Sequence, residues 1–328
     1  MSKRAVVARA LRRAAAWCAA VVVLAAVTGF CYESVARQGD PPVAGRLVDV
    51  GGHRLHVHCT GSGTTGSGTT GSGTTGSGTT GSGTPTVVLE AGLAESSASW
   101  DVIQRGLPGR VCAYDRAGYA WSEDGPAPRT ADRAAAELRA LLAAAGEAGP
   151  YVLVGHSYGG TIVRLFAHHW PALTAGLVLI DVTDENATEA LQISRPLLAT
   201  QFTVNQALAR VGVLRLFGDA LVPAEATAAA RASAPVVYGA GSMGAARAEA
   251  WAAADSAAQV RATVRPGAWR DLPVVVVIPA GQPATAADQA GRLAALSSRG
   301  RVVVAGTTDH YVQHAQPDLV IEAIRSVR

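Results

Sequence analysis

The chain has little excess charge, few aromatic side chains and few cysteines. Its 328 residues carry a formal net charge of +3 and only 5% Phe, Trp and Tyr. Five basic residues lie at the extreme N-terminus, namely Lys3, Arg4, Arg9, Arg12 and Arg13. Without them, 23 basic residues remain against 25 acidic ones. The rest of the chain therefore lacks the basic stripe and aromatic platform that nucleic-acid binding requires, and nucleic acid is not an expected partner.

The four cysteines form no zinc-type cluster, and no metal or organic cofactor is expected. His53, His56 and His58 alternate on an early strand, where a metal site would need all three side chains on one face and an open coordination position. We interpret them as ordinary strand residues. The apolar fraction of 49% is sufficient for one sizeable core.

The N-terminus carries one long apolar segment. Ala14 to Tyr32 are 19 residues without a charge, and at about 1.5 Å per helical residue they would span roughly 28 Å, enough to cross a bilayer. The basic residues before it predict a cytoplasmic segment 1–13 and an exported remainder. We expect residues 14–36 to be a retained single-pass anchor. Ser34, Val35 and Ala36 also offer a signal-peptidase site, so a cleaved signal peptide and a secreted protein remain the alternative.

The most informative motif is Gly155-His156-Ser157-Tyr158-Gly159-Gly160. It follows the apolar run Tyr151–Val154 and precedes a helical pattern that starts at Thr161. A strand, a sharp glycine turn with one serine, and a helix form a nucleophile elbow, in which the strained turn exposes the serine hydroxyl. The pattern occurs once, although 36 glycines could produce it by chance. Ser157 is the predicted nucleophile.

Serine needs a base to take its proton and a group to orient that base. In hydrolases with this elbow the order along the chain is Ser, acid, His, and the base follows the last strand. His310 in Gly306–Tyr311 fits that place better than His314, which would lie a turn into the next helix. His310 is the predicted base.

Short apolar strands alternate with helical patterns, which is typical of a mostly parallel sheet covered by helices. Strands are predicted at Thr86–Glu90, Val111–Tyr114, Tyr151–Val154, Leu177–Asp181, Val274–Pro279 and Arg301–Ala305. Helices are predicted at Ser97–Arg105, Thr130–Ala145, Thr161–His168, Asp288–Ser297 and Pro317–Ser326. The alanine-rich stretch 182–270 interrupts this alternation and predicts a helical cap over the site. The Gly-Ser-Gly-Thr-Thr repeat at 61–84 predicts a flexible loop, inserted in a hairpin between the strand that ends at Cys59 and the strand Thr86–Glu90.

Several segments together resemble α/β-hydrolases of the membrane-anchored or secreted actinobacterial type. They are His58–Gly61, Val88–Gly92, Cys112–Tyr119, the elbow, Leu177–Asp181 and Asp309–Gln313 leading to Pro317. The resemblance implies an eight-stranded, mostly parallel sheet with helices on both faces. It also implies a hydrolase core formed by 37–181 and 271–328, with the cap between strands 6 and 7.

The resemblance also implies site residues. The second and fourth strands of that fold are neighbours, so Cys59 and Cys112 would form a disulfide in an oxidising compartment, with two independent buried thiols as the alternative. The oxyanion donors would be the backbone N–H groups of Tyr158 and Leu93.

The triad acid departs from the commonest pattern of the family, because the segment after the strand Val274–Pro279 carries no carboxylate nearby. Asp181 matches an alternative acid position of the family, and Asp288 is the second candidate.

A serine nucleophile argues against the dehalogenases and epoxide hydrolases of this fold, which use aspartate. Hydrolysis of a carboxylic ester of a small molecule is therefore the leading hypothesis, through an acyl-enzyme on Ser157. An acyltransferase, lactonase or peptidase on the same triad, and a ligand-binding module without catalysis, remain alternatives. Phe202, Met243 and Trp251 are candidates to line the substrate pocket.

Overall fold

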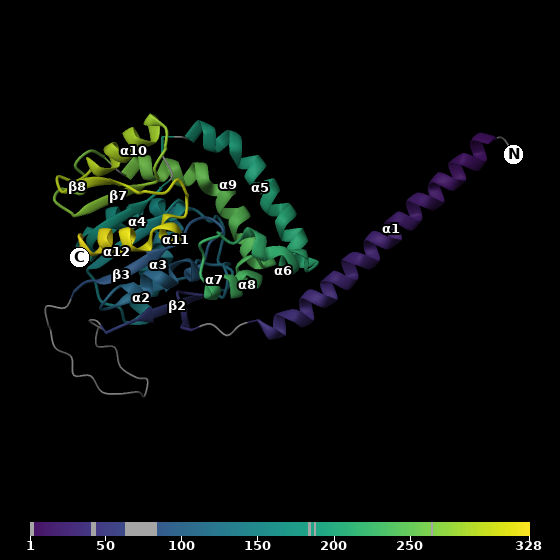
Figure 1. The fold of residues 1–328 in the computed structure, drawn as a ribbon, viewed down its shortest axis with the longest axis horizontal. Coiled ribbons are helices and arrows are strands. Elements are labelled where there is room, and N and C mark those ends of the chain that lie inside the picture. Colours follow the sequence, from purple (N-terminus) through teal and green to yellow (C-terminus); the bar gives the residue numbers. More distant parts are fainter. Residues whose placement is uncertain (1–2, 41–43, 63–83, 183–184, 187, 264) are drawn as a thin grey trace.

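An eight-stranded sheet forms the centre of the molecule, in the strand order β1-β2-β4-β3-β5-β6-β7-β8 (Figure 1). The computed structural model describes residues 3–40, 44–62, 84–182, 185–186, 188–263 and 265–328. The strands are β1 (Arg46–Asp49), β2 (Arg54–Thr60), β3 (Thr86–Glu90), β4 (Val111–Tyr114), β5 (Tyr151–His156), β6 (Thr174–Ile180), β7 (Val274–Ile278) and β8 (Gly300–Val304). Strands β3 to β8 are parallel, and β1 and β2 are antiparallel.

The central strands are buried on both faces, which explains their nearly continuous apolar sequences. Alternate side chains serve two separate cores. On β3, Val88 joins one core, and Val87 and Leu89 join the other. The predicted mostly parallel sheet is therefore confirmed.

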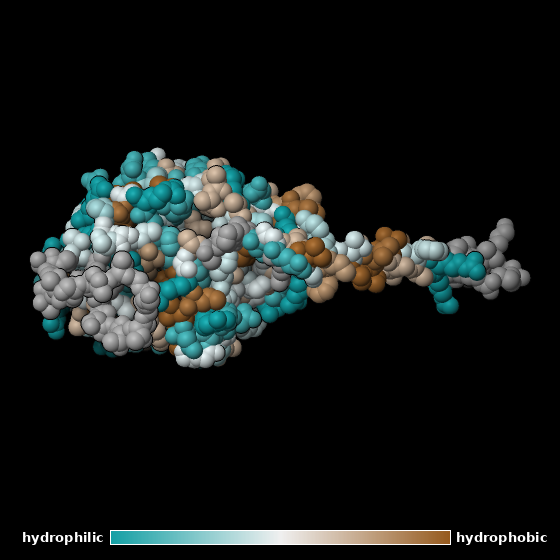
Figure 2. All heavy atoms as spheres, turned by 90° about the horizontal axis from the view of Figure 1, so that it is seen from below, coloured by the Kyte–Doolittle hydropathy of each residue, from teal (hydrophilic) through white to brown (hydrophobic). Residues whose placement is uncertain are grey.

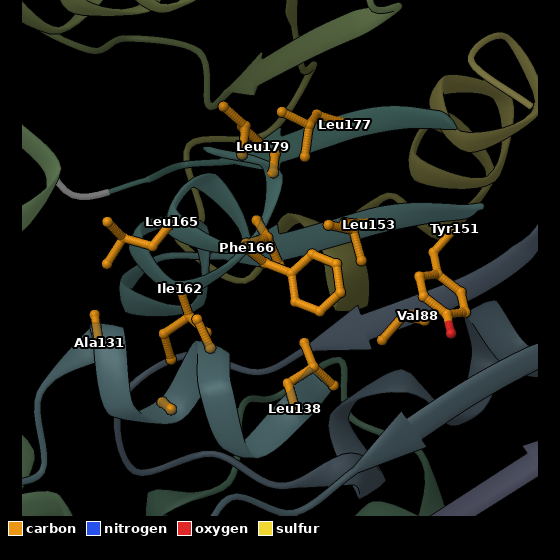
Figure 3. Close-up of a cluster of buried hydrophobic side chains, with 14 of the residues drawn as sticks. Val88, Ala131, Leu138, Tyr151, Leu153, Ile162, Leu165, Phe166, Leu177 and Leu179 are labelled. Atoms are coloured by element: carbon orange, nitrogen blue, oxygen red, sulfur yellow. The ribbon is translucent and has the colours of Figure 1, made fainter. Parts of the chain in front are cut away.

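Helices cover both faces of the sheet. Helices α3 (Ala131–Ala145), α4 (Tyr158–His169) and α10 (Ala284–Ala294) pack on the face that includes Val88. Figure 3 shows Leu138 of α3 and Ile162 and Phe166 of α4 against that face. The opposite face is covered by η2 (Ser97–Trp100), α2 (Asp101–Gly106) and α12 (Pro317–Arg325), which the short helix α11 (Val312–Ala315) precedes. A short η3 (Pro171–Leu173) leads into β6.

The insertion between β6 and β7 is helical, at the predicted position. It contains α5 (Thr188–Arg210), α6 (Val213–Phe217), η4 (Gly218–Leu221), α7 (Ala228–Ala232), α8 (Ala234–Val237) and α9 (Ala240–Thr263). Helices α5 and α9 pack against each other and share a small core with Tyr119 of the sheet domain. We call residues 185–263 of this insertion the cap.

Several predicted boundaries were wrong. Helix α4 begins at Tyr158 and not at Thr161, because Gly159 and Gly160 of the elbow are already helical. Strand β6 starts at Thr174, which pairs with Tyr151, and ends before Asp181.

Helix α10 spans Ala284–Ala294 and not Asp288–Ser297. It begins directly after Pro283. It ends where Gly300 packs so closely that a Cβ there would lie 1.9 Å from the Ala294 carbonyl oxygen.

The predicted hairpin was also wrong, because β4 lies between β2 and β3. Cys59 and Cys112 face each other in the β2–β4 register and form a disulfide. The repeat residues 63–83 lie outside the described residues.

The N-terminal helix α1 (Lys3–Ala36) projects away from the body and continues into a short η1 (Arg37–Gly39) (Figures 1 and 2). Within the described residues, its segment Leu11–Ala36 is long and apolar enough to cross a membrane, with a mean hydropathy of 2.2. Most of that stretch is exposed, and Glu33 near its C-terminal end is the buried exception.

Candidate active site

Ser157 occupies the sharp turn between β5 and α4. Its backbone has φ 51° and ψ −121°, a strained conformation for a residue with a Cβ. The turn requires glycine on both sides: a Cβ at Gly155 would lie 2.7 Å from the Gly160 backbone, and one at Gly159 would lie 2.6 Å from the carbonyl oxygen of Ala91. The Ser157 N–H donates to the carbonyl of Ile180 at 2.9 Å, which fixes the turn to β6. This is the geometry of a nucleophile elbow.

Asp181 and His310 are hydrogen-bonded to each other. His310 Nδ1 and Asp181 Oδ2 are 2.6 Å apart. Asp181 directly follows β6, has φ 42°, and donates its N–H to the Val277 carbonyl at 2.8 Å. Asp288, the other candidate acid, is exposed on α10, and none of its described contacts joins it to His310.

The three predicted triad residues follow the carboxyl ends of parallel strands, where sites of open α/β sheets form. Ser157 follows His156, which pairs with Ile180 just before Asp181. His310 lies in the loop after β8, and its carbonyl is 3.0 Å from His156 Nε2. The rings of His156 and His310 have centroids 4.6 Å apart. His310 is thus held against the residue that precedes the candidate nucleophile.

His156 forms a buried ion pair that sequence reasoning did not identify. Its Nδ1 is 2.7 Å from Glu95 Oε1, and Gln313 donates to the other oxygen of Glu95 at 3.3 Å. Burial opposes a charge on His156, but the Glu95 carboxylate raises the pKa of the imidazole above its usual value. Burial likewise disfavours the carboxylate, and His156 lowers the pKa of Glu95. Both ring nitrogens of His156 face hydrogen-bond acceptors, namely Glu95 and the His310 carbonyl. His156 therefore suits a structural role next to His310 rather than the role of a base.

Two backbone N–H groups could stabilise an oxyanion near Ser157. Tyr158 is the first residue of α4, and the first N–H groups of a helix have no intrahelical acceptor. Leu93 lies in the loop after β3, and its N–H makes no hydrogen bond to any residue that the structure describes. The two groups follow neighbouring strands, because Glu90 of β3 pairs with Gly155 of β5.

A buried arginine supports the Leu93 loop. Arg116 donates to the carbonyls of Ala91 and Gly92 at 2.6 and 2.8 Å. The same guanidinium pairs with Glu90 at 2.7 Å and with Glu249 of the cap at 2.7 and 2.9 Å. The strand end, the candidate oxyanion loop and the cap are therefore joined by one cation.

Two tyrosines complete this cluster. Tyr119 donates to Glu249 at 2.7 Å, and Tyr114 donates to Glu90. Burial, together with the nearby Glu249 carboxylate, raises the pKa of Glu90 to about 7 although the Arg116 guanidinium opposes this shift. Tyr158 is joined to the cap as well, because its hydroxyl lies 3.0 Å from Ser256 Oγ.

Two cavities contain the predicted pocket residues. The smaller, about 170 Å³, is lined by Phe202 and Met243 of the cap, by Glu95 and by Tyr311, the neighbour of His310. The larger, about 570 Å³, contains Trp251 and lies between α5, α9 and residues 127–129. None of the three triad residues lines either cavity. The smaller one is the better candidate for a substrate, because Ala94 and Tyr311, the neighbours of Leu93 and His310, line it.

Cys59, Cys112 and Glu147 bring potential metal ligands within 4.8 Å of one another. The two sulfurs are bonded to each other and cannot coordinate as thiolates. This cluster therefore does not form a metal site.

The sequence could have indicated a structural role for His156, but not its partner Glu95, which is 61 residues away, and not Glu249. A histidine inside the buried motif before Ser157 must have hydrogen-bond partners, and that requirement was a usable signal. Glu249 has no such signal, because it lies 133 residues from Arg116 on an alanine-rich helix.

A family model described as "Alpha/beta hydrolase family" matches residues 87–323, more than two thirds of the chain. The uncharacterized protein YqjL of Bacillus subtilis is 40% identical over 98 residues, which are 29% of this chain and 39% of YqjL. The chain thus spans well under half of the length of this curated relative.

Solved structures share the fold. The Cif epoxide hydrolase from Acinetobacter nosocomialis matches with a TM-score of 0.67 and 13% identity, over 92% of this chain and 96% of that one. A thermophilic esterase from Thermogutta terrifontis matches with a TM-score of 0.59 and 20% identity, over 87% and 97%. At such low identity these likenesses establish the architecture alone.

Proposed function

Since the chain belongs to the alpha/beta hydrolase family and is a hydrolase of that superfamily, we propose that it cleaves a carboxylic ester of a small molecule through Ser157. The observation that carries this proposal is the strained serine turn beside the hydrogen-bonded Asp181–His310 pair. Epoxide hydrolases of this fold use an aspartate at the elbow, so the serine favours acyl chemistry.

In the proposed mechanism, Asp181 holds the His310 Nδ1–H and leaves Nε2 free to take the proton of Ser157. The serine oxygen attacks the acyl carbon, and the N–H groups of Tyr158 and Leu93 stabilise the oxyanion. His310 then returns the proton to the departing alcohol, and an ester bond to Ser157 remains. Water activated by His310 hydrolyses that bond and restores the free serine.

The buried charges near the site fit this role. His156, paired with Glu95, hydrogen-bonds to the His310 carbonyl and so supports the His310 backbone. Arg116 supports the Leu93 loop by donating to the Gly92 carbonyl. An acyltransferase, a lactonase and a peptidase would use the same groups, and a binding module would need none of them.

We further propose that α1 is retained as a membrane anchor, with the catalytic domain outside the cytoplasm. Glu33 of α1 is only 4% exposed and pairs with Arg215 of the cap at 2.8 Å. Cleavage after Ala36 would remove Glu33 and leave Arg215 with Asp40 alone, at 2.6 Å. A buried ion pair between α1 and the cap favours a retained anchor over a cleaved signal peptide.

The test uses the full chain in detergent micelles with a fluorophosphonate probe and short p-nitrophenyl esters. We expect labelling and turnover in the parent, no labelling in Ser157→Ala, and a loss of turnover of up to about a millionfold. Asp181→Asn should lower kcat by about ten-thousandfold, whereas Asp288→Asn is the matched control and should match the parent. A folded parent that neither labels nor turns over any ester would refute the proposal and favour the binding module.

A further inference from the structure

The C-terminal turns of α1 pack directly on the cap. A Cβ at Gly29 would lie 2.2 Å from the carbonyl oxygen of Val211, in the turn between α5 and α6. In the same turn, a Cβ at Gly212 would lie 2.8 Å from the ring of Tyr32. Together with the Glu33–Arg215 pair, these contacts hold the turn and α6 against α1.

The level of this contact relative to a bilayer follows from helix geometry. Glu33 lies twenty residues beyond Arg13, and at about 1.5 Å per residue this distance is about 30 Å, the thickness of the hydrocarbon core. With Arg13 at the cytoplasmic boundary, Glu33 lies at the outer boundary and Gly29 about 6 Å inside it. The α5–α6 turn that touches Gly29 is therefore at the depth of the outer leaflet.

The surface next to this contact is apolar. On α6, Leu216 is 62% exposed and Phe217 is 67% exposed, and Leu221 at the end of η4 is 48% exposed. Figure 2 shows hydrophobic side chains gathered where the body meets the N-terminal helix. We call Leu216, Phe217 and Leu221 the α6 patch.

The α6 patch continues into the candidate substrate cavity. Leu221 lines the 170 Å³ cavity together with Phe202, Val237 and Met243. Ala94, Glu95 and Tyr311 also line that cavity, and Ala94 and Tyr311 are the chain neighbours of Leu93 and His310. The cavity thus offers a path from the α6 patch to the residues next to Leu93 and His310, and its lining includes Glu95 and Asn205 as well as apolar side chains.

From this juxtaposition we propose that the α6 patch rests in the outer leaflet of the membrane that α1 crosses, and that the substrate is an ester with a long apolar group that enters from that leaflet. This inference rests on the proposed esterase function and assigns its substrate class. Burial of Leu216 and Phe217 in lipid would also remove two large apolar side chains from water.

The first experiment tests the membrane contact without activity. The full chain carrying Cys18→Ala and Cys31→Ala receives Leu216→Cys, labelled with a polarity-sensitive fluorophore, in phosphatidylcholine vesicles. Val304→Cys is the matched control, because Val304 is 61% exposed on β8, far from α1 (Figure 1). We expect a blue shift and quenching by brominated lipids at position 216 only. Equal spectra at both positions would overturn the proposal. So would a blue shift that vanishes when the protein is diluted in lipid, because the label would then report contact with a second copy of the chain and not with lipid.

The second experiment compares two substrates for the double variant Leu216→Ser/Phe217→Ser. Turnover of a long-chain acyl ester dissolved in the vesicles should fall about tenfold, since two apolar lipid contacts are lost. Turnover of p-nitrophenyl acetate should not change, and Val304→Ser should change neither rate. An equal loss of turnover on both substrates, or no loss on the vesicle-borne ester, would overturn the proposed entry of substrate from the outer leaflet. If the parent cleaves no ester but the label at 216 still enters lipid, the proposed function fails while the membrane contact stands.

Discussion

Replacement of Arg116 by methionine should destabilise the protein strongly. The side chain is buried and lies between two buried carboxylates, Glu90 and Glu249. Removing one partner of a buried ion pair costs about 3–5 kcal/mol, because the remaining charge has no compensation. The lost hydrogen bonds to Ala91 and Gly92 add about 1 kcal/mol or more each. We expect a total on the order of 5 kcal/mol, a large part of the 5–15 kcal/mol that stabilises a typical protein.

The measurement is thermal and urea unfolding of the full chain in micelles at pH 7. A loss of this size should lower Tm by on the order of 10 °C. Arg54→Met is the control, because Arg54 is 54% exposed and pairs with the exposed Glu123. The exposed pair should contribute less than about 1 kcal/mol.

A double-mutant cycle identifies the cause. Glu249→Gln alone removes the excess negative charge and should cost only about 1 kcal/mol. In the variant that combines Arg116→Met with Glu249→Gln, a single carboxyl remains, and it can be protonated near neutral pH. The two changes should therefore cost less together than their sum, by about 1–3 kcal/mol. Additive costs, or an Arg116→Met loss no larger than that of Arg54→Met, would refute the electrostatic reasoning.

Three further predictions concern the disulfide, pH and the support of the base. Cys59→Ala/Cys112→Ala should cost about 4 kcal/mol in urea unfolding, because the bond closes a loop with a sequence separation of 53 residues. The free energy of unfolding should fall by about 3 kcal/mol as pH rises from about 4.5 to about 7, because Glu90 keeps its proton to a higher pH in the folded state than in the unfolded state. The variant Glu90→Gln should not show this decline. Glu95→Gln should lower kcat by about tenfold to a hundredfold with little change in KM, because His156 loses its charged partner; a shift in KM alone would contradict the positioning role.

Local signals allowed the elbow and several strands to be predicted. Strands β3 and β4 have the predicted bounds because each is a short apolar run with proline or glycine just before it. Ser157 could be identified because strand, turn and helix are contiguous in sequence. His310 followed from its place after the last strand, and the structure joins it to the first of the two acids considered.

Long-range contacts could not be read from the sequence. Glu33 and Arg215 are 182 residues apart, and neither has a local pattern that points to the other. In the cap, the many alanines give little contrast between buried and exposed faces. Phe202 and Trp251 therefore looked equivalent in sequence, but they line different cavities.

The Cys59–Cys112 bond also determines what proteolysis can release. Residues 63–83 lie between the two cysteines, so a protease that cuts the Gly-Ser-Thr repeat leaves both fragments covalently joined. The fragment with α1 also keeps its β2 strand paired with β4. If α1 anchors the protein as proposed, release of the hydrolase domain from the membrane by a cut in the repeat would therefore require reduction of this disulfide as a second event.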